Sequence, residues 1–129
     1  MYIIINININ RPEAGQIDFI CPAFFFGKMD FYKTTRWKKL REKILRRDGY
    51  MCQISKRYGR SVKADTVHHI FPRERYPELA WEPWNLISLS AAAHDKLHDR
   101  DTHELTKEGK ALQERTRRKY GGRYRIPPP

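Results

Sequence analysis

Histidine is concentrated in one part of this chain. Four of the five histidines lie between residues 68 and 98, as the adjacent pair His68 and His69 and the spaced pair His94 and His98. Asn85 stands between the two pairs. A fold that brings the pairs together must place residues from different elements around one centre, and imidazoles converging in that way can hold a divalent cation.

The segment that carries these residues predicts a small α+β unit. Residues 67–70 and 86–89 are short apolar runs typical of strands, and the three prolines between them indicate an irregular loop. Ser90 is a good helix N-cap, and the helix that it opens is expected to run to about residues 98–101. The predicted order is strand, loop, strand, helix.

The spacing of the histidines suggests a division of labour. On a helix, His94 and His98 share one face and can bind one cation. His68 and His69 are neighbours on a strand, so their side chains point to opposite faces; one could bind the metal while the other faces a substrate as a general base. Asn85 could brace the loop by bonds to backbone or, as a weaker option, bind the metal. A single histidine, or one such spaced pair, would more often be an ordinary residue; His103 is taken as a surface residue.

A basic helix precedes this segment. Thr34 or Thr35 can cap it, Asp48 and Gly49 end it, and an apolar stripe runs along it at helical spacing. Glu42 is its one acid. Contact with phosphates is favoured over a merely solvated face, because balanced pairing would need more acids. The candidate phosphate-binding residues of this helix are Arg36, Lys38, Lys39, Arg41, Lys43, Arg46 and Arg47.

The charge of the whole chain points in the same direction. The 129 residues carry 26 Lys and Arg against 15 Asp and Glu, a net charge of +11. This balance favours a polyanionic partner, with DNA or RNA first, over a basic protein without one. A last helix is expected from Thr106 to Tyr120, ended by the glycines after it. Near its end lie Arg115, Arg117 and Arg118, which we expect to act as a clamp on DNA.

The cysteine count and the apolar runs bound the remaining possibilities. Two cysteines are too few for the disulfide framework of a small secreted domain, so we expect a reduced, cytoplasmic protein. No apolar run is long enough to span a membrane, and the N-terminus does not resemble a signal peptide. Residues 2–10 alternate in a strand-like pattern and residues 17–26 are apolar and aromatic, which predicts an N-terminal arm that packs on the core or on a partner.

Three stretches together resemble the HNH endonuclease motif: residues 67–72 (VHHIFP), 85–89 (NLISL) and 94–98 (HDKLH). The basic segment at 37–52 resembles the lead-in helix of phage and bacterial members. The resemblance implies a ββα-metal core over residues 31–105, flanked by the arm (1–30) and a basic C-terminal helix and tail (106–129).

The resemblance also implies a role for each residue of the motif. It makes His68 and His94 metal ligands and His98 a third ligand or a phosphate contact. It makes His69 the general base and Asn85 the residue that positions the base loop. The family hydrolyses DNA with a divalent cation, leaving 5′-phosphate and 3′-hydroxyl ends.

The chain departs from many relatives at a second metal site. Those relatives carry two C-x-x-C pairs that hold a structural zinc, whereas the corresponding residues here are 52–55 (CQIS) and 90–93 (SAAA). Zinc needs about four good ligands, so we expect no structural zinc. Packing by Tyr50, Trp81, Trp84 and the arm would then have to hold the fold.

Three functional hypotheses follow. The leading one is a single-metal DNA endonuclease of phage type, with Mg²⁺ or Mn²⁺ for activity, although Zn²⁺ or Ni²⁺ could bind the imidazoles. The alternative is a DNA-binding or packaging accessory that works with a partner such as a terminase. The third is a metal-binding module without a DNA role, which the charge opposes. The chain could act as a monomer or a homodimer.

Overall fold

The computed structural model describes residues 30–129, so the predicted N-terminal arm lies outside the described residues. The chain divides into two units, Met1–Lys39 and Leu40–Pro129. In the described part of the first unit, Phe31 and Tyr32 pack their rings against Trp37 at centroid distances of 5.2 and 5.3 Å. The Trp37 amide donates to Thr34 Oγ1 (3.1 Å), which confirms the predicted cap of helix α2, Thr35–Arg47.

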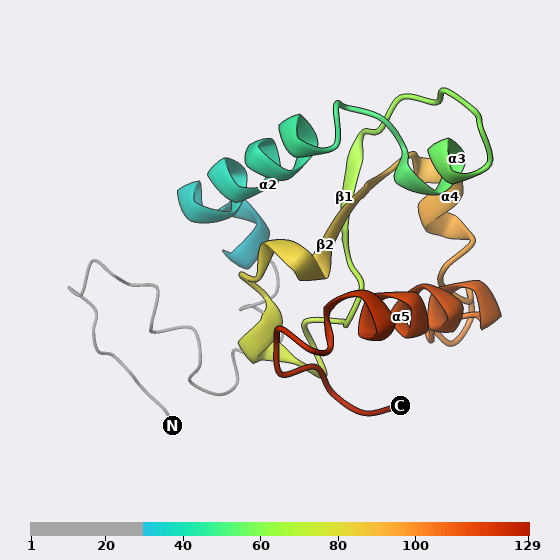
Figure 1. Cartoon of the computed structure of the whole chain (residues 1–129). Helices are drawn as coiled ribbons and strands as arrows, with labels where there is room; N and C mark the ends of the chain where they lie inside the picture. The colour runs from blue at the N-terminus through green and yellow to red at the C-terminus, as the bar shows by residue number, and fades with distance from the viewer. Residues whose placement is uncertain (1–29) are drawn as a thin grey trace. The chain divides into compact units, whose positions relative to one another are not determined.

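The second unit is built on a two-stranded antiparallel sheet (Figure 1). Strand β1, Thr66–His69, pairs with β2, Leu86–Leu89, in a register that sets His68 opposite Ile87 and His69 opposite Leu86. Two short 3₁₀ turns, Pro77–Leu79 and Pro83–Asn85, shape the connection between the strands. Both strands and the irregular loop are as the sequence predicted, and the chain is of the α+β class.

Helix α4, Ala91–Asp95, follows β2 and is shorter than expected. Ser90 caps it by accepting a hydrogen bond from the Ala93 amide (3.3 Å). The predicted extension to residues 98–101 is wrong. The Leu97 carbonyl accepts instead from the Thr106 amide (2.9 Å), and Asp99 Oδ1 accepts from the amides of residues 101 and 102. These bonds satisfy the backbone in a loop rather than in a helix.

Two further helices complete this unit. Helix α3, Gln53–Arg57, lies in a stretch that the sequence had suggested was only loop and turn. Helix α5, Lys107–Tyr120, has the predicted bounds, and Thr106 caps it by accepting from the Gly109 amide (3.3 Å). Among the described residues, no helix has the length and apolarity needed to cross a membrane.

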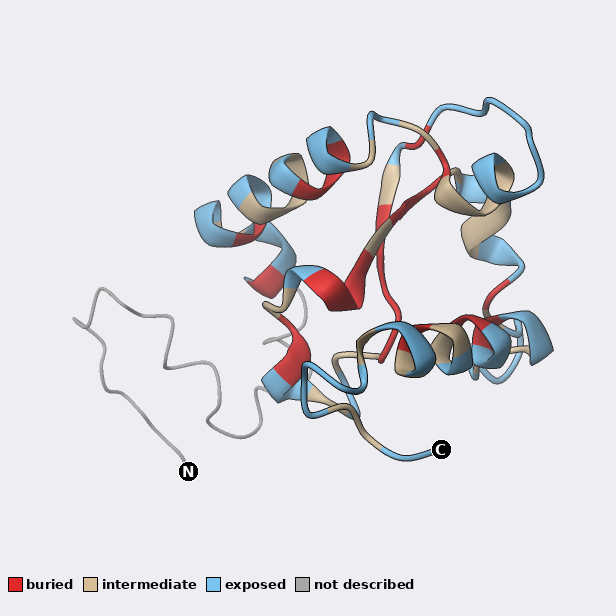
Figure 2. Cartoon of the chain, viewed as in Figure 1, coloured by how far each residue is buried: buried red, intermediate tan, exposed pale blue. Residues whose placement is uncertain are grey.

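The core of the second unit gathers around the sheet, the loop between its strands and the buried face of α5, while α3 adds only a partly buried residue, Ile54 (Figure 2). Trp84 is buried as predicted, but Tyr50 exposes 42% of its surface and so contributes little to the core. The core residues are Cys52, Ile70, Phe71, Leu79, Trp84, Leu89, Leu97 and Leu112. This packing holds the histidine-bearing strand rigidly on one side and leaves the α4 side to the site.

Candidate metal centre and base site

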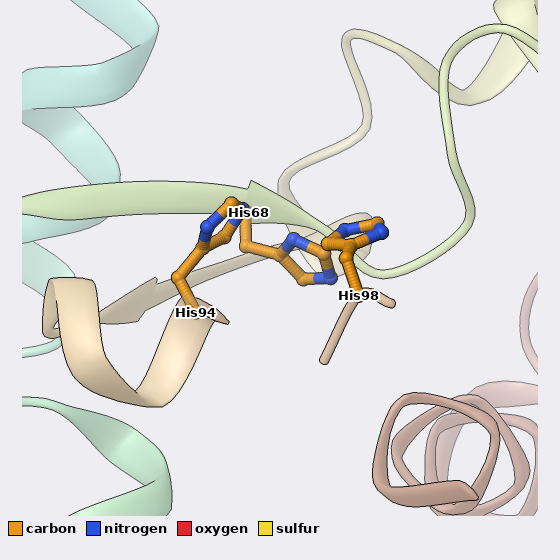
Figure 3. Close-up of side chains that lie close together, drawn as sticks. All are labelled: His68, His94 and His98. Atoms are coloured by element: carbon orange, nitrogen blue, oxygen red, sulfur yellow. The ribbon is translucent and has the colours of Figure 1, made fainter. Parts of the chain in front are cut away.

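The alternation of β1 separates the two adjacent histidines. His68 points toward His94 and His98, whereas His69 bonds to the Ala80 carbonyl, contributed by the loop between the strands. In Figure 3 the His68 ring lies between the other two imidazoles, with His94 rising from the end of α4 and His98 from the segment after it. The strand therefore creates two chemically distinct places one residue apart.

His68, His94 and His98 form a cluster with the geometry of a metal site. One ligand nitrogen from each lies within 4.8 Å of the others. His68 is buried, and its Nε2 has no hydrogen-bond partner. An orphaned, buried ring nitrogen is costly unless something coordinates it, so the three imidazoles fit a divalent cation such as Mn²⁺, Ni²⁺ or Zn²⁺. Three protein ligands leave further coordination positions open, as in catalytic rather than structural sites.

The surroundings of His68 and His94 favour their neutral forms. Burial lowers the pKa of His68 well below its usual value, and the nearby His94, His98 and His69 lower it further. Burial also lowers the pKa of His94, with His98 adding to the effect and Asp95 opposing it. An imidazole must be unprotonated to bind a metal, so His68 and His94 favour the form that a cation requires even without one bound.

His98 is oriented by a group that sequence reasoning missed. Its Nδ1 lies 3.3 Å from the carbonyl oxygen of His103, so Nδ1 carries the proton and donates it, while Nε2 is the nitrogen with the lone pair. His103 has a positive φ of 60°, and its carbonyl is placed by the loop that replaces the expected helix extension. A backbone acceptor of this kind has no residue-type signature in the sequence.

His69 is also fixed by a backbone carbonyl. Its Nε2 lies 3.1 Å from the Ala80 oxygen, which can only accept, so Nε2 bears the proton and Nδ1 carries the lone pair. His69 exposes 7% of its surface. Burial lowers the pKa of His69, the bond to Ala80 raises it, and the nearby Arg73 lowers it, with a net decrease.

Asn85 is fully buried, and both polar atoms of its side chain are hydrogen-bonded. Its Oδ1 accepts from the Phe71 amide (2.7 Å), and its Nδ2 donates to the carbonyls of Phe71 (3.1 Å) and Leu79 (3.0 Å). Phe71 lies two residues after His69, and Leu79 lies directly before Ala80. The Asn85 side chain thus ties the residues that follow His69 to the turn that orients it, and these three hydrogen bonds go to none of the clustered histidines.

The basic residues of α2 differ in how much of their charge the fold uses. Arg47 is the most engaged: its guanidinium pairs with Asp48 and donates to the Pro83 and Leu86 carbonyls, both at 2.8 Å. Arg41 donates to the Asp65 carbonyl (2.6 Å), and Arg46 pairs with Glu42. The remaining candidates of this helix have exposed side chains: Arg36, Lys38, Lys39 and Lys43.

On α5, Arg117 is turned into the fold, whereas the next two residues are exposed. Its guanidinium donates to the Pro127 carbonyl (2.8 Å) and lies 5.1 Å from the centre of the Phe71 ring. Arg118 is exposed. Burial lowers the pKa of Arg115, and the positive charge of Arg57 lowers it further. Arg57 and Arg118 lie close enough to Arg115 for their positive charges to repel its own, and such a cluster could bind an anion.

Of the four positions that correspond to the zinc-binding pairs of the relatives, only Cys52 is a cysteine, and two serines lie beside it. The Ser55 and Ser90 hydroxyls lie 3.4 and 3.7 Å from Cys52 Sγ. Burial raises the pKa of the Cys52 thiol, but the bonds from Ser55 and Ser90 outweigh it and bring the pKa to about 7. The hydrogen bond from Ser90 connects the residue before α3 with the residue before α4, whereas many HNH relatives hold a structural zinc at the corresponding positions.

A comparison with solved structures finds a related fold. The chain superposes on the crystal structure of the HNH endonuclease of the deep-sea thermophilic bacteriophage GVE2 with manganese ion, with a TM-score of 0.53 and 24% sequence identity. The match covers 68% of this chain and 88% of that one. The chain has an HNH-type fold. By sequence, no family model and no curated protein matches the chain. The HNH fold expected from the three motif stretches is thereby confirmed.

Proposed function

We propose that the protein is a metal-dependent DNA endonuclease. The observation that carries the proposal is the separation on β1 of a three-histidine cluster from a fourth histidine held in one tautomer. Hydrolysis of a phosphodiester needs a cation at the phosphate and a base for the attacking water, and these two places supply both. The HNH fold shared with a phage endonuclease crystallised with manganese supports it.

In this proposal His68, His94 and His98 hold one divalent ion, Mg²⁺ or Mn²⁺ for activity. When bound, that ion would neutralise charge on the scissile phosphate and on the departing oxygen. The protein's part is to present three imidazoles from β1, α4 and the segment beyond it. The bond from His98 Nδ1 to the His103 carbonyl keeps Nε2 available as a ligand.

His69 acts as the general base. With its Nε2 proton held by the Ala80 carbonyl, Nδ1 accepts the proton of a water molecule as the water attacks phosphorus. The lowered pKa of His69 leaves it unprotonated at neutral pH, as a base must be. Asn85 is a positioning residue, because it acts on the backbone around His69 and Ala80 rather than on the reacting atoms.

DNA is the proposed partner, bound through its phosphates. The exposed cations of α2 and α5 would carry most of this contact, whereas the bonds of Arg41, Arg46, Arg47 and Arg117 within the fold leave them less to offer. We place the nuclease in residues 31–105, with flanking segments 1–30 and 106–129. We expect it to act in the cytoplasm, as a monomer or a homodimer.

The test is cleavage of supercoiled plasmid by the purified protein with Mg²⁺, Mn²⁺, Ni²⁺, Zn²⁺ or EDTA. The proposal predicts nicked or linear products with at least one metal and none with EDTA, and products that end in 5′-phosphate. Binding of DNA without cleavage under every metal would reject the enzyme and support the packaging accessory. Absence of salt-dependent DNA binding would reject both.

A further inference from the structure

The C-terminal segment packs against the 3₁₀ turn Pro83–Asn85, in the loop between the two strands. Tyr124 stacks on Trp84, with ring centroids 5.4 Å apart and planes 22° from parallel. Trp84 directly precedes Asn85 in the same 3₁₀ turn. A displacement of the Trp84 ring would therefore also move the backbone of Asn85, whose side chain holds the residues around His69 and Ala80.

Helix α5 reaches the same loop through its side chains. Gln113 Nε2 donates to the Ile70 carbonyl (2.9 Å), and Ile70 is the residue that follows His69. The Ile70 amide in turn donates to the Asn85 carbonyl (2.8 Å). The Gln113 side chain of α5 thus holds Ile70, which lies between His69 and Phe71, the residue bonded to Asn85.

Arg117 joins the helix, the loop and the end of the chain. Its guanidinium lies over the ring of Phe71, whose backbone amide and carbonyl are both bonded to Asn85. The same guanidinium donates to the Pro127 and Pro128 carbonyls (2.8 and 3.1 Å). The tail is thereby bound back onto α5, where Tyr124 can meet Trp84.

The contacts that Tyr124, Gln113 and Arg117 make with this part of the chain fall on Trp84, Ile70 and Phe71, which lie next to Asn85 or after His69, and none of them falls on His68, His94 or His98. From this asymmetry we propose that Tyr124 and Gln113 are positioning residues for the general base, with Arg117 fastening the tail that bears Tyr124. The inference rests on the proposed function, since it assigns these residues to the base of that reaction. The C-terminal segment is then part of the catalytic apparatus rather than only a clamp on DNA.

The experiment compares Tyr124→Ala and Gln113→Ala with two reference variants. Tyr124→Phe keeps the stacked ring, and Tyr58→Ala removes a tyrosine that exposes 68% of its surface elsewhere in the chain. For each protein, kcat and KM for plasmid cleavage and the affinity for Mn²⁺ are measured. The expected result is that Tyr124→Ala and Gln113→Ala lower kcat about tenfold at unchanged KM and Mn²⁺ affinity. Tyr124→Phe should restore kcat, and Tyr58→Ala should leave it at the wild-type value.

A second readout does not depend on cleavage. Hydrogen exchange of the Phe71 amide, which reports its bond to Asn85 Oδ1, should quicken in Tyr124→Ala but not in Tyr124→Phe. If the wild type cuts no DNA, the proposed function fails while this exchange still tests the coupling. Unchanged exchange and unchanged kcat in a folded Tyr124→Ala would overturn the inference, as would an equal loss of kcat and Mn²⁺ affinity.

Discussion

At the scale of single residues, Asn85 shows how a polar group is accommodated in a small core. It is completely buried, and both of its polar atoms are paired with backbone of the base loop. A buried amide is tolerated only when it is satisfied, and here its partners are the groups that hold His69 and Ala80 in place. The residue type follows from this need, since only an amide offers one acceptor and two donors at that point.

Replacing Asn85 should therefore cost stability in an order set by chemistry. Asn85→Ala leaves one amide and two carbonyls unpaired, at about 2–3 kcal/mol. Asn85→Asp keeps the shape but turns a carboxylate oxygen toward the Phe71 and Leu79 carbonyls, and this should cost more, about 3–5 kcal/mol. Urea unfolding of both variants measures the difference. An Asp variant as stable as the wild type would show that these bonds do not hold the loop.

At the scale of elements, the metal side of the site depends on how closely α5 approaches the segment before it. A Cβ added to Gly109 would lie 2.7 Å from the Leu97 carbonyl and 2.8 Å from Leu105 Cδ2. Leu97 precedes His98, and Leu105 pairs with His98 in an isolated bridge. The third histidine of the cluster is thus placed by a helix that contributes no residue to the cluster itself.

Gly109→Ala should consequently behave unlike a glycine substitution in an open helix. An open site would gain about 1 kcal/mol from the change, whereas here the close contact should make it destabilising by about 1–3 kcal/mol. Thermal unfolding and Mn²⁺ titration should both show a loss. Gly122→Ala is the matched control, because an added Cβ there meets nothing within 4 Å. Equal stability of the two variants would contradict this account of α5.

At the scale of the whole molecule, the three pKa shifts of His68, His69 and His94 act in the same direction on stability. Each histidine is held below its usual pKa in the folded state, chiefly by burial. Protons therefore bind the unfolded chain more readily, and stability that is fully present above pH 6.5 is lost as the pH falls below it. The metal-free protein should thus weaken in mild acid.

The measurement is the unfolding temperature of metal-free protein between pH 7.5 and 5.5, above the range in which the carboxylates titrate. The free energy of unfolding should fall by up to about 1.4 kcal/mol per pH unit for each such histidine below pH 6.5. Saturating Mn²⁺ should raise the unfolding temperature while keeping the pH slope, since bound ligands stay unprotonated in the fold while the unfolded chain still takes up protons. A flat profile without metal would mean that the imidazoles are not held neutral by the fold.

Local signals in the sequence predicted most of the molecule. The strands, the bounds of α5 and the cap of α2 follow from apolar patterns and from single residues such as Thr34 and Thr106. The end of α4 could not be predicted from local signals, because it is decided by the hydrogen bond that the Thr106 amide donates to the Leu97 carbonyl across the loop. Helix α3 is too short to show a period.

The sequence predicted which side chains of the candidate site come together, but not the backbone carbonyls that orient them. The convergence of His68, His94 and His98 matches the expectation, although His98 reaches the cluster from beyond the helix and not along its face. The carbonyls of Ala80 and His103, which orient the imidazoles, depend on turn geometry and not on residue type. The inward turn of Arg117 was equally hidden, because charge alone does not say where a guanidinium points.

In the proposed reaction His68 and His69, adjacent in the chain, have different roles: His68 binds the metal and His69 is the base. This assignment is tested most directly by measuring Mn²⁺ binding by calorimetry and plasmid cleavage side by side in the wild type, His68→Ala and His69→Ala. The account predicts that His68→Ala loses both binding and cleavage. His69→Ala should keep Mn²⁺ binding and lose cleavage by about 100-fold or more. Undiminished cleavage by His69→Ala, or loss of its Mn²⁺ binding, would contradict the assignment.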